Sequence, residues 1–231
     1  MTELLQQCAS WGVFVTLVAY AIGAVINRKT GWALFNPLLL GSIFVIVFLR
    51  CFAIPYAEYS ASAAPVNWLM APATVSLAIP LYEKWELLEK NVGAILVSIL
   101  AGVITSLGSV LAMVWILNME HAHAVTLLPK SVTTAIGMDI AETLGGTAPL
   151  AGAVIILTGI AGSLLAESIC KIFHITDPVA KGLALGTSSH AVGTSKALQM
   201  GEVEGAISGL AIAVAGVLTA LLAPMAANFL P

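Results

Sequence analysis

Uncharged runs of about 20 residues or more dominate this sequence, at residues 4–27, 30–49, 59–82, 91–119, 143–166 and 205–231. About 20 apolar residues, each rising about 1.5 Å along a helix, cross the hydrocarbon core of a bilayer. Charged residues make up only 9% of the chain, against about 25% in soluble proteins, which is too few to cover a water-exposed surface. The sequence therefore predicts a multi-pass membrane protein and excludes soluble enzymes and nucleic-acid-binding proteins.

The chain divides into eight apolar segments, with predicted spans 8–27, 33–54, 66–83, 91–117, 124–143, 148–172, 180–199 and 204–229. Only helices and closed barrels satisfy the backbone hydrogen bonds in lipid, and the alternating pattern of barrel strands is absent. We therefore predict an all-α polytopic membrane protein that forms a single transmembrane domain over residues 1–231.

Two of these segments are unsuited to a continuous helix. The first has a proline at either end of a short stretch, Pro72 and Pro80, and the second, Gly186–Ser195, combines hydroxyl residues with a histidine and two glycines. Proline removes a helix hydrogen bond and glycine loosens the backbone. We expect both segments to be interrupted or re-entrant helices that face a protein-lined cavity.

An internal repeat emerges when the chain is shifted by 112 to 114 residues: Ala21-Ile-Gly23 meets Ala135-Ile-Gly137, Asn36-Pro37-Leu38 meets Ala148-Pro149-Leu150, and the two interrupted segments coincide. We predict a first repeat at 8–117 and a second at 122–229. Paired repeats with interrupted segments are typical of secondary transporters.

The orientation of the two repeats depends on whether the interrupted segments cross the membrane. If they are re-entrant, the repeats are inverted, and one side of the membrane carries Arg28, Lys29, Lys130, Lys171, Lys181 and Lys196. An excess of Lys and Arg marks the cytoplasmic side. This count favours inverted repeats over parallel ones.

A group of polar residues opens the fifth segment at Pro129, Lys130, Ser131, Thr133 and Thr134. The free N–H groups and the positive dipole end of a helix N-terminus attract anions, and Lys130 adds a full charge. Two interpretations remain open. The group either binds an anionic substrate, or it is an ordinary capped helix start with a lysine that reaches the membrane interface.

A second polar group, Ser188, Ser189, His190 and Thr194, lies in the interrupted segment 180–199. Polar side chains inside a membrane are costly and often mark a substrate pathway. His190 is a candidate for proton coupling because imidazole titrates near neutral pH. Lys196 either pairs with a substrate carboxylate or anchors the helix at the interface.

The first half supplies weaker candidates. We expect Pro72–Ser76 to face Gly186–Thr194 near the bilayer midplane, so that Pro72, Ala73 and Thr74 contribute to the substrate site. Asn36 either lines the same polar cavity or caps a helix, and capping is the safer interpretation. Asp139 is a second candidate for coupling, unless it lies at the far interface. We expect no catalytic residues, metal site or cofactor, since nucleotide-binding, hydrolase and zinc motifs are absent.

Several motifs resemble the LrgB/CidB family: Asn36-Pro37-Leu38-Leu39, Pro72-Ala73 with Pro80-Leu-Tyr-Glu83, Leu128-Pro-Lys-Ser-Val-Thr-Thr134, Gly182 to Thr194 and Glu204-Gly-Ala-Ile-Ser208. The resemblance implies a multi-pass protein of the bacterial inner (cytoplasmic) membrane, usually paired with a small LrgA/CidA-type membrane protein. It implies antiholin-like control of murein hydrolases and cell lysis. It also implies kinship with the plant plastid glycolate/glycerate translocator, with bacterial pyruvate uptake and with elevator-type transporters.

Two functions therefore compete. The first is an elevator-like, proton- or cation-coupled carrier of small 2-hydroxy or 2-keto carboxylates of the glycolate, glycerate and pyruvate class. The alternative is a non-transporting, antiholin-like regulator of murein hydrolase activity and lysis that acts with the LrgA/CidA-type partner. Interrupted helices and a polar membrane interior favour the carrier. By analogy with transporters that have a moving domain, we expect a homodimer.

Overall fold

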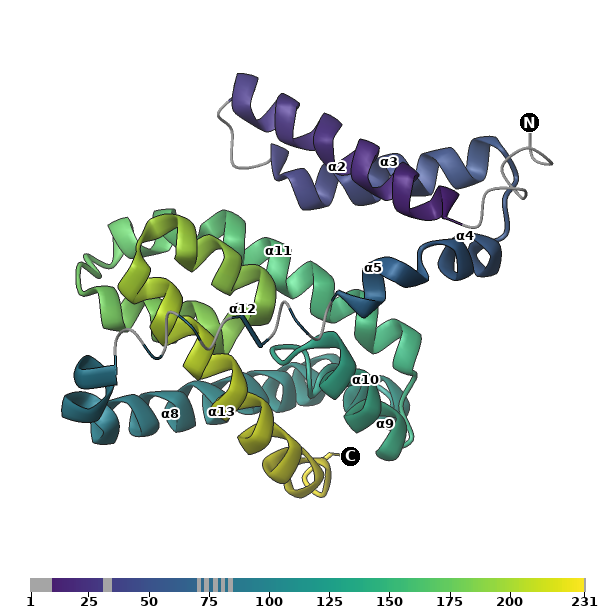
Figure 1. The fold of residues 1–231 in the computed structure, drawn as a ribbon. Coiled ribbons are helices and arrows are strands. Elements are labelled where there is room, and N and C mark those ends of the chain that lie inside the picture. Colours follow the sequence, from purple (N-terminus) through teal and green to yellow (C-terminus); the bar gives the residue numbers. More distant parts are fainter. Residues whose placement is uncertain are drawn as a thin grey trace. The chain divides into compact units, whose positions relative to one another are not determined.

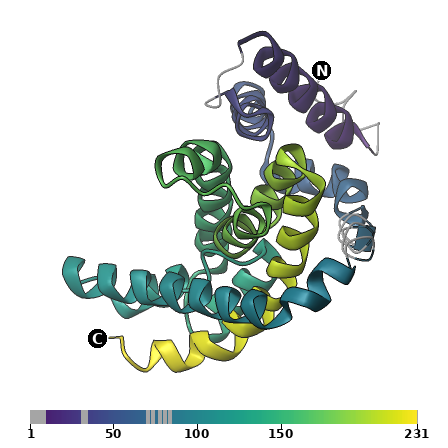
Figure 2. The same ribbon diagram turned by 90° about the vertical axis from the view of Figure 1, so that its left-hand side faces the viewer.

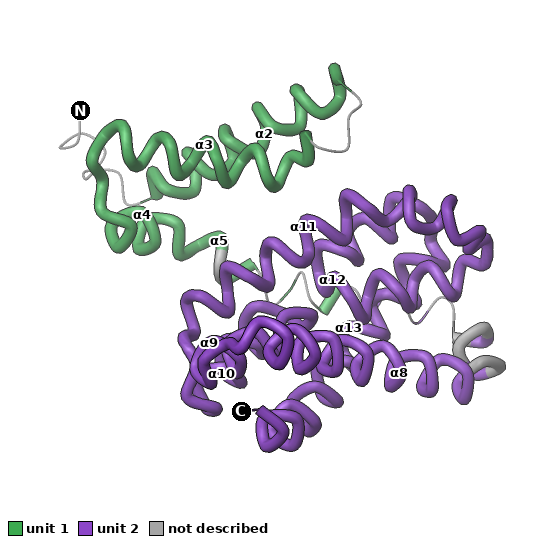
Figure 3. Tube along the Cα trace, turned by 180° about the vertical axis from the view of Figure 1, so that it is seen from behind, with its two compact units in different colours: residues 1–76 green, residues 77–231 purple. Residues whose placement is uncertain are grey.

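The computed structural model describes residues 10–30, 35–69, 72, 75, 76, 79, 82 and 85–230. Every regular element among these residues is helical, which confirms the all-α class. Contacts divide the chain into two compact units, residues 1–76 and residues 77–231 (Figure 3). This division reflects contact density, so the predicted repeats at 8–117 and 122–229 stay a prediction.

The first unit is built on a helical hairpin. Helix α2 (Trp11–Thr30) packs beside α3 (Pro37–Cys51), and the short helices α4 (Tyr56–Ser62) and α5 (Ala64–Trp68) follow along the chain (Figure 1). The hairpin corresponds to the predicted segments 8–27 and 33–54. Half of the predicted segment 66–83 lies outside the described residues.

Local contacts explain where the helices of the first unit begin and pack. Asn36 Oδ1 accepts a hydrogen bond from the Leu38 N–H at 2.8 Å, and Pro37 fills the first helical position, where a missing N–H is tolerated. The hydroxyl of Tyr59 lies 2.7 Å from Thr16 Oγ1, which joins α4 to α2.

The second unit consists, in its described part, of the helices α8 (Trp85–Leu117), α9 (His121–Leu127), α10 (Thr134–Thr143), α11 (Ala148–Ile172), α12 (Pro178–Met200) and α13 (Glu202–Ala227). Helix α12 packs between α11 and α13, and α13 crosses α8 (Figure 1 and Figure 2). Each helix therefore has one face in the unit and one face turned outward.

The core of the second unit lies between α8 and α13. One face of α8 carries buried side chains at intervals of three or four residues, which is the helical period: Ile95, Ile99, Val103, Leu107, Val110 and Val114. They pack with small residues of α13, among them Ala211 and Ala215, which allow two helices to approach closely in a membrane. The opposite face of α8 is also apolar but exposed, as at Ile104 and Ile116, which suits contact with lipid.

The predicted segment 124–143 is not one helix. The chain instead forms the two short helices α9 and α10, separated by residues 128–133. Pro129 lacks an N–H to continue a helix, and the backbone of Thr133 is extended at φ −64° and ψ 150°. The helix start predicted after Pro129 is therefore found, but the span that runs through it is wrong.

Four helices of the described part are long and apolar enough to cross a membrane: Trp11–Thr30, Val92–Leu117, Ala148–Ile172 and Glu202–Ala227. Helix α3 is apolar but shorter, with 15 residues. The chain is therefore a multi-pass membrane protein, whereas eight segments and inverted repeats stay a prediction.

Candidate functional site

Helix α12 is interrupted at His190, inside the segment that the sequence predicts to be broken. Its start is regular, because Asp177 accepts a hydrogen bond from the Ala180 N–H and Pro178 fills the first position. At His190 the backbone adopts φ 42° and ψ −139°, values that glycine tolerates and other residues rarely adopt. The helix is thereby divided into two parts, residues 178–189 and 191–200.

Hydroxyl side chains just before the interruption bond to the backbone of their own helix. Thr187 Oγ1 donates to the Leu183 carbonyl at 2.7 Å, and Ser188 Oγ donates to the Ala184 carbonyl at 2.7 Å. Such bonds to the preceding turn often accompany helix bending. The hydroxyl-rich sequence therefore favours the geometry found here.

The imidazole of His190 is fixed against α11. Its Nε2 lies 2.8 Å from the carbonyl oxygen of Ile155, and the residue is only 3% exposed. A carbonyl oxygen only accepts hydrogen bonds, so Nε2 carries the proton in this contact. Nδ1 is consequently the nitrogen at which His190 could gain or release a proton.

Two further hydroxyls tie the interruption to α13. Thr194 Oγ1 donates to the His190 carbonyl at 3.1 Å and lies 2.7 Å from Ser208 Oγ. Both hydroxyl residues are buried, at 1% and 0% exposure. We refer to Ser189, His190, Thr194 and Ser208 together as the break cluster.

Two glycines of α11 allow the break cluster to approach that helix. A Cβ at Gly162 would overlap Ser189 Oγ and lie 2.7 Å from Ser189 Cβ. A Cβ at Gly159 would lie 2.6 Å from His190 Nε2. Because the two glycines are three residues apart, they lie on the same face of α11, and both positions exclude a larger side chain.

A second cluster surrounds Lys130 in the turn between α9 and α10. Its Nζ lies 3.2 Å from Ser131 Oγ and 3.4 Å from Ser106 Oγ of α8, and the two serine oxygens are 2.9 Å apart. Lys130 is half-buried, and no carboxylate of the described residues lies within 4 Å of its ammonium group. We refer to Ser106, Lys130 and Ser131 as the lysine cluster.

Helix α8 connects the two clusters. Thr187, three residues before His190, packs so closely on Gly102 that a Cβ there would lie 3.0 Å from Thr187 Oγ1. Ser106 is four residues further along α8, which is about 6 Å. Ser106, which belongs to the lysine cluster, and Gly102, which contacts Thr187 just before the break cluster, therefore lie on adjacent turns of α8.

Comparison with known proteins places this arrangement in a family. A model of the LrgB-like family matches residues 16–229. The chain belongs to the LrgB-like family. The antiholin-like protein LrgB of Bacillus subtilis (strain 168) is 35% identical over 216 residues, covering 93% of this chain and 94% of that protein. The proteins of the same name from Bacillus mycoides (strain KBAB4) and Bacillus cereus (strain B4264) are each 34% identical over 221 residues, covering 95% of this chain and 96% of the relative. No solved structure matches the chain.

In this member of the LrgB-like family, the predicted site residues of the second half are distributed over the two clusters. Ser189, His190 and Thr194 belong to the break cluster, whereas Lys130 and Ser131 belong to the lysine cluster. Three others take different places. Ser188 is exposed, while Thr133 is the N-cap residue of α10, without a side-chain cap bond, and Thr134 is its first residue.

The predicted residues of the first half lie in the first unit or outside the described residues. Asn36 and Pro72 belong to the first unit, where Asn36 uses Oδ1 to cap α3 and Pro72 is exposed. Ala73 and Thr74 lie outside the described residues. A site shared by residues 72–76 and 186–194 stays a prediction.

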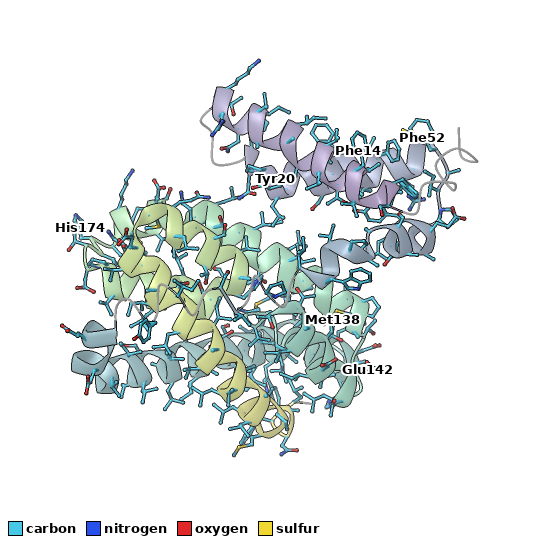
Figure 4. All side chains as sticks on the ribbon, in the orientation of Figure 1. Phe14, Tyr20, Phe52, Met138, Glu142 and His174 are labelled. Atoms are coloured by element: carbon cyan, nitrogen blue, oxygen red, sulfur yellow. The ribbon has the colours of Figure 1, made fainter. Side chains whose placement is uncertain are left out.

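Asp139 lies on the outer side of α10. Met138 faces α11, because a Cβ at Gly152 would lie 3.1 Å from its sulfur, whereas Asp139 and Glu142 are exposed. Figure 4 labels Met138 and Glu142 on this helix, and His174 at the turn between α11 and α12. A coupling role for Asp139 stays a prediction.

The sequence left Lys196 with two possible roles and pointed to no site role for Ser106 or Ser208. Lys196 Nζ forms an ion pair with Glu167 Oε1 of α11 at 2.5 Å. Ser208 lies in a motif that carries the family resemblance, so a signal for it existed. Ser106 gave no such signal, because its partner Ser131 is 25 residues away, in the turn between α9 and α10.

Replacing Thr194 by valine should destabilise the protein by about 1–3 kcal/mol. Valine preserves the shape of the side chain but removes the bonds to the His190 carbonyl and Ser208 Oγ, and leaves a buried hydroxyl without its partner. Thermal unfolding of the purified protein checks this. The double variant Thr194→Val with Ser208→Ala should lose less unfolding free energy than the two single variants together, since both substitutions remove the same hydrogen bond. Additive losses would contradict a direct interaction.

Proposed function

We propose that this chain is an antiholin-like membrane protein, which regulates murein hydrolase activity and cell lysis. The observation that carries the proposal is the relationship to proteins named antiholin-like over 93–95% of the chain. The four helices of the described part that are long and apolar enough to cross a membrane support it, since such a regulator acts within the membrane.

We also propose a location in the bacterial inner (cytoplasmic) membrane and a small LrgA/CidA-type membrane protein as partner. Both follow from the motifs that resemble the LrgB/CidB family. Large apolar side chains of α2 and α8 offer surface for lipid or for such a partner. Examples are Phe14, which is 70% exposed (Figure 4), and Ile116, which is 76% exposed.

A bacterial strain that lacks its own LrgB-like protein and the partner provides the test. Expression of this chain together with the partner should lower murein hydrolase activity in zymograms and slow detergent-induced lysis. Expression of either protein alone serves as the control and should have a smaller effect. Unchanged lysis with both proteins present in the membrane would contradict the proposal.

A carrier of small 2-hydroxy or 2-keto carboxylates, such as glycolate, glycerate and pyruvate, is the second candidate. The observation that favours it is the pair of polar clusters within the membrane protein. One is an interrupted helix with a buried histidine, and the other is a half-buried lysine with no carboxylate of the described residues within 4 Å. A regulator that does not transport has no evident need for either. His190 or Asp139 would couple transport to a proton or another cation.

Uptake of labelled glycolate and pyruvate into proteoliposomes tests the carrier, with and without a pH gradient and with and without the partner. A carrier should accumulate at least one of these anions, and Lys130→Gln should reduce the uptake. If the folded protein transports neither anion under any of these conditions, the carrier proposal is contradicted and only the regulator remains.

We further infer that the two predicted repeats are inverted and that the protein is a homodimer. The 112-to-114-residue offset in the sequence supports the repeats. Labelling of single cysteines placed at residues 118 and 231 tests the inverted topology, since inverted repeats of three crossings put these two positions on opposite sides of the membrane.

The resemblance to elevator-type transporters supports the homodimer. The mass of the detergent-solubilised protein tests the homodimer, and a strict monomer would contradict it.

A further inference from the structure

The ammonium group of Lys130 has unused hydrogen-bonding capacity. It has three N–H donors, and in the described structure two of them point to serine oxygens at 3.2 and 3.4 Å. These distances are long for bonds from a charged donor, which are usually about 2.7–2.9 Å. One N–H therefore remains for another acceptor, and the other two are only weakly engaged.

Among the described residues, no acidic side chain balances the charge of Lys130. A half-buried ammonium group without an acidic partner is costly in free energy, and no carboxylate of the described residues lies within 4 Å of it. By contrast, Lys196, which is also half-buried, is paired with Glu167. The lysine cluster therefore has a net charge of +1, which a single monovalent anion would balance.

The two serines supply a further donor. Each hydroxyl has one proton, and one of these two protons lies between Ser106 Oγ and Ser131 Oγ, which are 2.9 Å apart. Both oxygens also accept from Lys130. The second hydroxyl proton has no acceptor in the described structure, so it can donate to a ligand bound beside the free N–H of the lysine.

We propose that Ser106, Lys130 and Ser131 form a binding site for one monovalent oxyanion. In this site, Ser106 positions the ammonium group of Lys130 and, together with Ser131, supplies the free hydroxyl proton. The site rests on the second proposed function, the carboxylate carrier. It specifies the charge of the substrate and the hydrogen-bond donors that the substrate meets. An oxyanion offers two oxygens to the two free donors, which a spherical ion such as chloride does not. A divalent oxyanion such as sulfate would leave one negative charge uncompensated.

Formate and nitrate are suitable probes, because one is a carboxylate and the other an inorganic anion of the same charge. Calorimetric titration of the purified full chain at constant ionic strength should show binding of at least one of them. Binding of formate but not nitrate would identify a carboxylate site. Sulfate and chloride should bind at least tenfold more weakly than the better probe, and equal binding of sulfate would overturn the proposal.

Variants assign the residues. Ser106→Ala should weaken probe binding about tenfold, as expected for loss of one hydrogen bond to a charged ligand, and Ser106→Thr, which retains the hydroxyl, should preserve it. Lys130→Gln should abolish it. The matched control is Ser109→Ala, since Ser109 is an exposed serine on the same helix whose hydroxyl bonds only to the Ser106 carbonyl, and it should bind like the parent.

The outcomes separate the site from the carrier function. A parent protein that binds neither formate nor nitrate, or a Ser106→Ala variant that binds like the parent, would overturn the site. Binding that follows the predicted pattern in a protein that transports nothing in proteoliposomes would overturn the carrier and leave the anion site standing.

Discussion

Gly162→Leu is expected to abolish stable folding of the second unit, and Gly162→Ala to destabilise it by about 1–3 kcal/mol or more. Even the single Cβ of alanine would overlap Ser189 Oγ and lie 2.7 Å from Ser189 Cβ. Rotation of the serine hydroxyl would relieve the first contact but not the second, so α11 and α12 must move apart. Thermal unfolding and the yield of monodisperse protein in detergent measure the effect.

Gly108→Ala is the matched control for this prediction. Gly108 lies in α8, where a new Cβ would meet nothing within 4 Å, and alanine is the better helix former. This variant should be as stable as the parent or slightly more so. Ser189→Gly should in turn rescue Gly162→Ala, because it removes both atoms of the clash. A Gly162→Ala protein that unfolds at the temperature of the parent would contradict the close approach.

His190→Ala is expected to be less stable than His190→Gly, by about 1–3 kcal/mol. Both variants lose the bond from Nε2 to the Ile155 carbonyl and leave a cavity on α11, which costs on the order of 3 kcal/mol. Only glycine relieves the strained backbone at φ 42° and ψ −139°. The predicted order of unfolding temperatures is therefore parent, then glycine variant, then alanine variant.

His174 is a matched control, because it also has a positive φ, 54°, but its side chain is exposed (Figure 4). His174→Gly should match or exceed the stability of the parent, since it relieves the backbone and loses no buried contact. Equal stability of His190→Gly and His190→Ala would mean that the interruption of α12 is not strained.

The sequence was sufficient to predict the parts of the fold that depend on local patterns. The long uncharged runs correspond to α2, α8, α11 and α13, and the glycines and hydroxyls of 180–199 correspond to the break at His190. Proline and hydroxyl residues at 129–134 correctly placed the start of α10. Each of these features is determined by residues close together in the chain, either through helix capping or through loss of a backbone hydrogen bond.

Contacts between helices could not be predicted in the same way. The glycines at 159 and 162 look like ordinary small residues of a membrane helix, and only the packing of α12 shows that they exclude a side chain. Ser106 likewise looks like a packing residue until α8 brings it to Ser131. The segment 124–143 was delimited by its apolar composition, so the short helix α9 before Pro129 was not predicted as an element of its own.

The length of α8 has a consequence for the membrane around the protein. Its apolar part, Val92–Leu117, has 26 residues, or about 39 Å at 1.5 Å per residue, whereas the hydrocarbon core is about 30 Å thick. Such hydrophobic mismatch is relieved by tilting of the helix or thickening of the bilayer. Gly102 and Ser106 lie within this stretch and contact Thr187 and Ser131. If α8 tilts relative to its neighbours, we expect lipid chain length to affect both clusters at once.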